Sequence, residues 1–195
     1  MIFSINNQKE AYIALTTRDG VSFADVRDSM VIENLPFFEV KGRSGLYMLF
    51  NKFERSSEIF RYNNDIFADE ISFQSIVNYT VPKMRELLDE EELLKKDGKE
   101  WTNAVLIVYK GKIYTINQYF EVFENEEYCV HGVVARIMVC GCLSSDSELS
   151  IRQRFVETIK LLKEYEGFET FPLLLFNVKT CTYKKCWTID DILTD

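Results

Sequence analysis

The sequence predicts an α+β fold, a four-layer α/β/β/α sandwich with two antiparallel sheets. Two segments far apart, residues 12–25 and 103–116, share one design: a β-rich run, a charged residue and a glycine at a tight turn, then a second β-rich run. This is the pattern of a β-hairpin. Along the chain, strands are followed by two helices, more strands, two more helices and final strands. A sheet covered by helices on one face must bury its other face, so two such sheets packed face to face give four layers.

The first elements are strands. We expect a short edge strand at Ile2–Ile5, the first hairpin over Tyr12–Asp25 and a turn at Lys41–Gly45. Leu46–Phe50 is a continuous apolar run of strand length, which favours a central strand. Residues 51–62 then change to a helical period, with apolar residues separated by charges, and predict an amphipathic helix.

A longer helical region follows over Asp69–Leu94, where apolar residues recur at spacings of three and four. Ser72 or Asp69 has the side chain to cap its start. Pro82 lies inside the region and removes one backbone hydrogen bond. We therefore expect the helix to kink or break near Asn78.

The second half repeats the order of the first. The expected elements are the hairpin at 103–116, a sheet extension at Tyr119–Phe123, short strand Tyr128–Val130, helices Gly132–Leu143 and Ser147–Tyr165, buried strand Phe171–Val178, and a polar-edged strand at Thr180–Trp187. Trp101, Tyr114, Tyr119 and Phe120 are expected in the core or on sheet faces, although exposed examples would mark a partner surface.

Composition favours one domain over residues 1–195, with 180–195 as a C-terminal extension. The 195 residues are 47% hydrophobic, and the 8 glycines and 3 prolines leave no flexible linker. The net charge of −8 argues against a general grip on nucleic-acid phosphates. The sequence has neither an export signal nor a membrane-spanning run, so we expect a cytoplasmic protein in which the five cysteines stay reduced.

The order and spacing of these segments resemble the N-terminal-nucleophile (Ntn) hydrolase fold. More narrowly, they are similar to proteasome β-subunit-like proteins, including the bacterial ATP-dependent protease rings. The resemblance spans about Glu10 to Lys179. It is carried by Ile13–Asp25, by the proline-containing Thr80–Arg85, by Leu106–Ile116 and by the helix and apolar strand of Ser150–Val178.

The resemblance implies a demanding chemistry. The nucleophile is a Thr, Ser or Cys exposed as the mature N-terminus, whose own α-amine acts as general base. It opens the first strand, and counting back from Gly20 places it at Ala11, with Glu10 and Tyr12 beside it. None of these three side chains can act as that nucleophile. Catalytic activity of the family type is therefore not expected.

The other residues that the family's mechanism needs are also incomplete in this sequence. The family's Asp corresponds to Asp25 or Asp28, while its Lys falls near Leu35–Phe37, where there is no lysine. The turn after the central strand, where the family's backbone N–H groups stabilise an oxyanion, reads Phe50–Phe53 and lacks glycine. Loss of one member of such a unit already removes most of its rate enhancement.

Other chemistry has weaker support. Thr16 and Cys129 are the residual candidates for a repositioned nucleophile, and His131 lies two residues from Cys129. The spacing of Cys181 and Cys186 does not match the usual zinc pairs, and there is no phosphate loop or dinucleotide motif. We therefore expect no metal and no cofactor.

The leading hypothesis is a catalytically inactive proteasome-like domain that acts through protein binding or assembly, as a bacterial or phage accessory protein would. Family members commonly form rings, so self-association into a homo-oligomer is one form of that assembly. The alternative is an active peptidase or amidohydrolase with a repositioned or processed nucleophile. A third class, a regulatory protein acting on a host factor, predicts a co-purifying partner.

Overall fold

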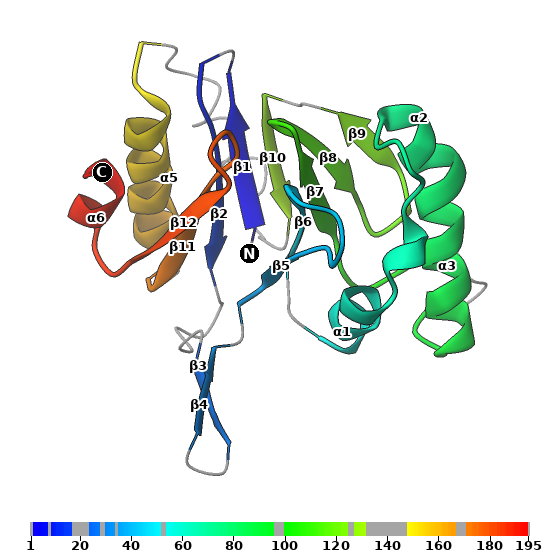
Figure 1. Ribbon diagram of the computed structural model, residues 1–195. Helices are drawn as coiled ribbons and strands as arrows, with labels where there is room; N and C mark the ends of the chain where they lie inside the picture. The colour runs from blue at the N-terminus through cyan, green and yellow to red at the C-terminus, as the bar shows by residue number, and fades with distance from the viewer. Residues whose placement is uncertain are drawn as a thin grey trace. The chain divides into compact units, whose positions relative to one another are not determined.

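The computed structural model describes residues 2–7, 9–16, 24–27, 30–33, 35–51, 54–95, 100–124, 127–131, 148–166 and 171–194. The chain divides into two compact units, residues 1–33 with 126–195 as the first and residues 34–125 as the second. Each unit contains one five-stranded antiparallel sheet, and the first also holds a two-stranded ribbon (Figure 1). The predicted α+β class with two antiparallel sheets is confirmed, whereas the single domain over 1–195 stays a prediction.

The sheet of the first unit has the order β10-β1-β2-β11-β12. Its strands are β1 (Ile2–Asn6), β2 (Ala11–Thr16), β10 (Tyr128–His131), β11 (Leu173–Asn177) and β12 (Thr182–Cys186). The prediction of an edge strand at the start of the chain is wrong, because β1 lies between β10 and β2. Its successive residues Ile2, Phe3, Ser4 and Ile5 are all buried, as expected of an interior strand covered on both faces.

The first predicted hairpin, Tyr12–Asp25, is also wrong. β2 pairs with β1 and β11, whereas β3 (Ala24–Arg27) pairs with β4 (Met30–Glu33) in the ribbon. The turn glycine of that prediction, Gly20, lies outside the described residues. The hairpin that forms instead joins β1 to β2. There the Asn7 side-chain oxygen accepts the backbone N–H groups of Lys9 (2.8 Å) and Glu10 (2.7 Å), which is the local bonding that makes Asn a turn residue.

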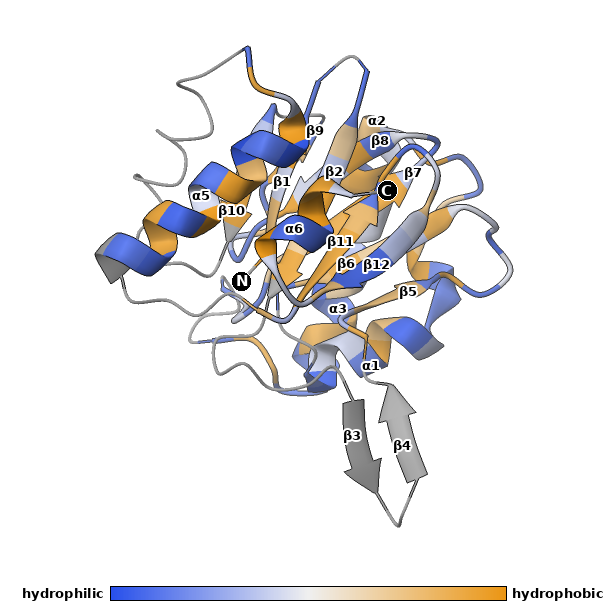
Figure 2. Cartoon of the chain, turned by 90° about the vertical axis from the view of Figure 1, so that its left-hand side faces the viewer, coloured by the Kyte–Doolittle hydropathy of each residue, from blue (hydrophilic) through white to orange (hydrophobic). Residues whose placement is uncertain are grey.

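Helix α5 (Ile151–Glu166) covers one face of this sheet and confirms the helix expected at 147–165. Phe155, Ile159 and Leu162 pack in one buried cluster with side chains from β1 and β11. The rings of Phe3 and Phe155 meet at 4.8 Å between centroids. Figure 2 shows the resulting bands of apolar and polar residues along the helix. The helix predicted at Gly132–Leu143 lies outside the described residues.

The segment expected as a C-terminal extension contributes β12 and the short helix α6 (Ile189–Leu193) to the first unit. β12 pairs along its length with β11, which confirms the strand predicted at Thr180–Trp187. Thr188 and Asp191 form a capping box at the start of α6. Cys186 and Ile192 are completely buried in the cluster beneath α5, so this segment forms part of the hydrophobic core of its unit.

The sheet of the second unit has the order β5-β6-β7-β8-β9. Its strands are β5 (Phe37–Glu39), β6 (Leu46–Phe50), β7 (Val105–Tyr109), β8 (Lys112–Ile116) and β9 (Val122–Glu124). The second predicted hairpin is confirmed as β7–β8, and Lys110 and Gly111 adopt positive φ angles of 48° and 75° at its turn. The strand predicted at Leu46–Phe50 is confirmed as β6, which pairs on both sides, although the centre of the sheet is β7 and not β6 as expected.

Two helical segments flank that sheet: α1 (Arg55–Tyr62), and a longer run composed of α2 (Phe73–Ser75), a π-helical turn (Ile76–Thr80) and α3 (Val81–Glu90). Ser72 caps the longer run, with its hydroxyl accepting the N–H of Ser75 at 3.2 Å. The π-helical turn surrounds Asn78, where Pro82 was predicted to disturb the helix. The wider turn accommodates a proline that cannot donate to the carbonyl four residues earlier.

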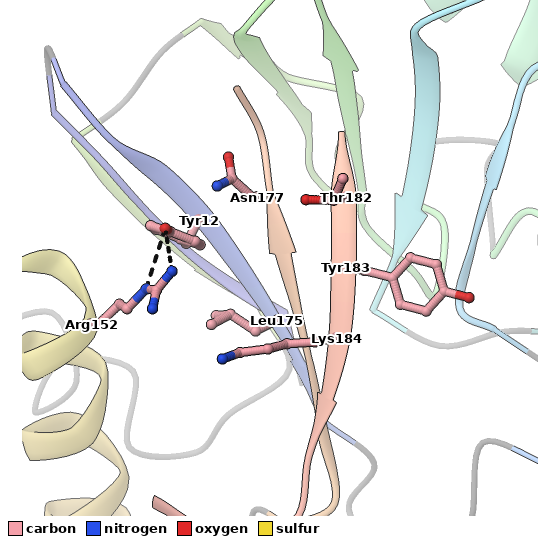
Figure 3. Close-up of a pocket in the computed structure, with 7 residues that line it drawn as sticks. All are labelled: Tyr12, Arg152, Leu175, Asn177, Thr182, Tyr183 and Lys184. Carbon is pink, nitrogen blue, oxygen red and sulfur yellow. Dashed lines mark hydrogen bonds between the residues drawn. The ribbon is translucent and has the colours of Figure 1, made fainter. Parts of the chain in front are cut away.

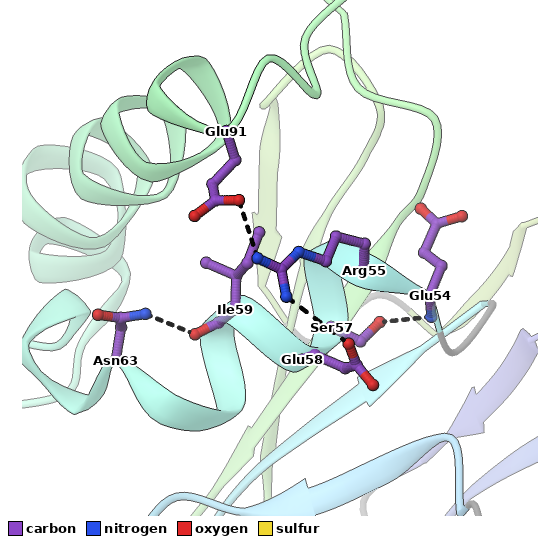
Figure 4. A network of polar contacts seen from close by, with 7 residues as sticks. All are labelled: Glu54, Arg55, Ser57, Glu58, Ile59, Asn63 and Glu91. Atoms are coloured by element: carbon purple, nitrogen blue, oxygen red, sulfur yellow. Dashed lines mark hydrogen bonds and ion pairs between the residues drawn. The ribbon is translucent and has the colours of Figure 1, made fainter.

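A polar network links α1 to the end of α3 (Figure 4). Arg55 donates to the Glu91 carboxylate at 3.0 Å, and Asn63 donates to the Ile59 carbonyl at 2.7 Å at the end of α1. The Arg55 and Glu91 side chains are 62% and 43% exposed, so this ion pair contributes at most about 1 kcal/mol. Apolar burial therefore holds the two helices in place.

The aromatic residues weighed from the sequence divide into two groups. Trp101, Tyr114 and Phe120 are buried in the core of the second unit, and the Trp101 and Phe120 rings stack at 6.1 Å. Tyr119, by contrast, is 52% exposed. None of the described helices is long and apolar enough to cross a membrane.

Candidate functional site

The residue expected at the nucleophile position, Ala11, opens β2 and faces Asn6 of β1. Its side chain is completely buried, and its carbonyl accepts the N–H of Val178 at 2.9 Å. Thr16 ends the same strand opposite Leu173. The structure therefore places these two candidates at opposite ends of β2.

The carboxylate candidates do not share that sheet. Asp25 lies on β3 opposite Ile32, in the two-stranded ribbon. Asp28 lies outside the described residues. Asp25 and Ala11 thus belong to different sheets.

Cys129 lies on β10 opposite Ser4 of β1, and its side chain is only 6% exposed. His131 ends the same strand, opposite Ile2. A catalytic thiol must reach its substrate as the thiolate, in a partly exposed and electropositive setting. The burial of Cys129 does not provide that access.

A pocket that sequence reasoning missed lies on the face of the first sheet that α5 covers (Figure 3). Its volume is about 260 Å³, and it is lined by Tyr12, Arg152, Leu175, Asn177, Thr182, Tyr183 and Lys184. Figure 3 shows Arg152 and Lys184 reaching toward the same side of β11 and β12, while the Tyr183 ring points away. Two cationic side chains thus border one small cavity.

The strand register builds the floor of this pocket. Asn177 of β11 faces Tyr12 on one side and Thr182 on the other. Two residues along, Leu175 faces Lys184 of β12. Because residues at i and i+2 of a strand share a face, these two rows of side chains lie next to each other on one side of the sheet.

Arg152 comes from α5 and is fixed from several directions. Its Nη2 and Nε donate to the Tyr12 hydroxyl oxygen at 3.0 and 3.3 Å, and its guanidinium carbon lies 5.3 Å from the centroid of the Tyr12 ring. Its Nη1 donates to the carbonyl oxygen of Thr194 at 2.6 Å, and Lys184 Nζ donates to the same oxygen. One backbone carbonyl therefore receives hydrogen bonds from two cations.

Two titratable groups lie near this pocket. Burial raises the pKa of the Cys186 thiol to about 11, and the nearby Asp191 adds to the rise, while the Lys184 and Arg152 charges act in the opposite direction. Hydrogen bonds from the backbone N–H groups of Trp187 and Thr188 lower the pKa of Asp191. The raised pKa of Cys186 and the lowered pKa of Asp191 both result from the packing of the C-terminal segment onto the sheet.

The sequence alone indicates some of the residues that line this pocket, but not that they lie together. Asn177, Thr182 and Lys184 are polar residues near the ends of predicted strands, but only the register shows that they share a face. Arg152 and Tyr12 lie 140 positions apart. Among the described residues, no cluster of three or more His, Cys, Asp or Glu side chains has the arrangement of a metal site.

No family model matches the sequence, and no curated protein matches it. The fold, however, is similar to that of several solved structures. Thiobacillus denitrificans BPH aligns at 14% identity and a TM-score of 0.62, over 90% of this chain and 96% of that one. Anbu (ancestral β-subunit) from Yersinia bercovieri aligns at 10% identity and a TM-score of 0.62, over 98% of this chain and 90% of that one.

HslV from Trypanosoma brucei aligns at 7% identity and a TM-score of 0.55, over 90% of this chain and 97% of that one. These are proteins of the proteasome-like Ntn-hydrolase fold. The comparison confirms the predicted fold class, an Ntn-hydrolase-like α+β sandwich, and assigns this chain a diverged form of it.

Proposed function

We propose that this chain is a catalytically inactive proteasome-like domain that acts through protein binding or assembly. The main support for the proposal is the residue at which the first hairpin begins. The Ntn-hydrolase resemblance implies that the nucleophile opens the first strand, and the first strand of the observed hairpin is β1, which begins at Ile2. We therefore assign the family's nucleophile position to Ile2 in preference to Ala11.

The nucleophile is missing whether its position is assigned to Ile2 or to Ala11. Ile2 and Ala11 are aliphatic, and both are completely buried. Neither offers a hydroxyl or thiol, so an adjacent amine would have no proton to abstract. The missing lysine near Leu35–Phe37 and the missing glycine at Phe50–Phe53 agree with this inference.

A role in binding is supported by exposed aromatic side chains on the second unit. Tyr119 is 52% exposed, and Phe73 and Phe123 are 39% and 37% exposed. Phe123 of β9 faces Thr115, whereas its neighbour Val122 packs with the helices on the other face of the sheet. Phe123 and Phe73 of α2 therefore do not share a face. Aromatic residues are enriched at the centres of protein interfaces. We call Tyr119, in the turn between β8 and β9, and Phe123 of β9 the aromatic surface.

Epoxomicin provides a direct test, because Thiobacillus denitrificans BPH has been solved in complex with it. Native mass spectrometry of both proteins after incubation with epoxomicin is expected to show the complex with BPH and none with this chain. Intact mass is expected to show a first residue other than Thr, Ser or Cys. BPH is the matched positive control for the reagent.

The alternative, an active hydrolase with a repositioned nucleophile, predicts the opposite results. An epoxomicin complex, or a mature chain beginning at Thr, Ser or Cys, would contradict the proposal of inactivity. Thr16→Ala and Cys129→Ala would then identify which residue carries the activity. The assembly half of the proposal is tested separately: a monomer in sedimentation velocity that captures no partner would count against it.

A further inference from the structure

We propose that Arg152 and Lys184 form a carboxylate-binding site in the pocket on the helix-covered face of the first sheet. This proposal is independent of the proposed function, because the pocket contains neither Ile2 nor any candidate nucleophile. All of its lining residues belong to the first unit. The ligand is a carboxylate group, presented by a small free acid or by an acidic side chain of a protein.

The first argument is the oxygen that the two cations already share. Arg152 Nη1 and Lys184 Nζ both donate to the Thr194 carbonyl oxygen. This neutral planar oxygen stands in for one oxygen of a carboxylate, which has the same geometry and adds a full negative charge. The bonds to the Thr194 carbonyl are charge-assisted only through their ionised donors. A carboxylate oxygen would also bring a negative charge to the acceptor side, so it is the better partner for this pair of cations.

The second argument is preorganisation. The Tyr12 hydroxyl accepts from two nitrogens of Arg152, and the Tyr12 ring is only 6% exposed. The guanidinium is thus held in one orientation, with Nη1 directed at the shared oxygen. Lys184 projects from β12, whose register against β11 is fixed. Groups that are already ordered lose less conformational entropy when a ligand binds.

The third argument is the size and charge of the cavity. Its volume of about 260 Å³ corresponds to roughly nine water molecules, which suits a small acid or one Glu side chain. Leu175 provides an apolar floor on which a short methylene chain can lie. The nearby Asp191 carboxylate is directed at the backbone N–H groups of Trp187 and Thr188, at the start of α6. In a chain of net charge −8, this pair of cations is a local site that favours anions.

Isothermal titration calorimetry on the full chain tests the proposal with two probes. Glutarate represents the free acid, and a capped Val-Glu-Val peptide represents the acidic side chain, with capped Val-Gln-Val as its neutral match. Glutarate binding supports a free carboxylate as ligand. Binding of the Glu peptide without glutarate supports an acidic protein segment. If neither probe binds, or if the Gln peptide binds as tightly as the Glu peptide, the proposal is overturned.

Matched variants then locate the site. Lys184→Gln is expected to weaken binding by roughly tenfold or more, because it removes one charged hydrogen-bond donor. Lys185→Gln changes the net charge equally and lies on the same strand, but it does not line the pocket. It is expected to bind as the parent chain does. Equal affinity for Lys184→Gln and the parent chain, with an unchanged Tm, would place the binding elsewhere and refute the site.

Discussion

The thiol of Cys186 is expected to resist alkylation in the native protein under conditions in which Cys181 reacts. Cys186 is completely buried and its pKa is raised from 9.0 to about 11, whereas Cys181, in the turn between β11 and β12, is partly exposed. The comparison uses iodoacetamide at pH 8, with peptide mapping by mass spectrometry to follow each cysteine separately. The thiolate is the reacting species, so the pKa controls the rate.

The magnitude follows from the shift. Two pKa units lower the thiolate fraction of Cys186 roughly 100-fold at pH 8. A thiolate of higher pKa is intrinsically more nucleophilic, and over two pKa units this raises the rate constant of the thiolate by roughly a factor of ten. The net chemical effect is therefore a rate about tenfold below that of an ordinary thiol, and burial lowers it further. In urea the difference between Cys186 and Cys181 is expected to disappear.

The same shift predicts how stability depends on pH. The pKa of Cys186 is higher in the folded state than in the unfolded state, because the buried site disfavours the thiolate. The stability that goes with keeping this thiol neutral is therefore fully present below pH 9 and is lost as the pH rises through about 11. Two units correspond to about 2–3 kcal/mol. Cys186→Ala is the matched control, since other groups titrate in both proteins and the difference isolates this thiol. Native labelling of Cys186 as fast as Cys181 would refute the reasoning and show that the C-terminal segment is not docked as part of the core.

Two further predictions concern packing and assembly. Phe155→Ala removes a completely buried ring that contacts Phe3, and is expected to cost about 3–5 kcal/mol in urea denaturation; a loss below about 1 kcal/mol would mean that α5 is not packed on the sheet as described. Replacing Tyr119 and Phe123 together by Ser is expected to weaken self-association in sedimentation velocity and leave Tm nearly unchanged; an unchanged mass distribution would exclude the aromatic surface from the assembly.

Local signals were enough to predict some of these elements. The β7–β8 hairpin is encoded by Lys110–Gly111, because both residues must adopt positive φ and glycine makes that conformation inexpensive. The disturbance near Asn78 follows from the missing donor of Pro82 alone. In both cases the cause lies within five residues of the effect, so a single sequence suffices.

The pairing of β2 could not be predicted in the same way. Residues 12–25 carry a turn signal at Gly20, but β2 pairs with β1 and β11, and β11 lies more than 150 residues away. A strand pairs where its apolar residues find matching neighbours on both faces, and that choice is made by the whole sheet. The pocket has the same origin, since Tyr12 and Arg152 meet only once β2 and α5 are in place.

The aliphatic residues at the starts of β1 and β2 show why the fold and the chemistry separate so readily. Packing a β-sheet core requires apolar side chains of suitable volume at many positions, and different combinations of them satisfy it. Nucleophilic catalysis requires particular atoms at a few positions, and the absence of one removes most of the rate. Ile2 and Ala11 meet the first requirement completely, since both are fully buried, and neither can meet the second. If the proposed inactivity holds, selection on this chain acts on surfaces that bind, and the residues to test first are those that are exposed or line a cavity.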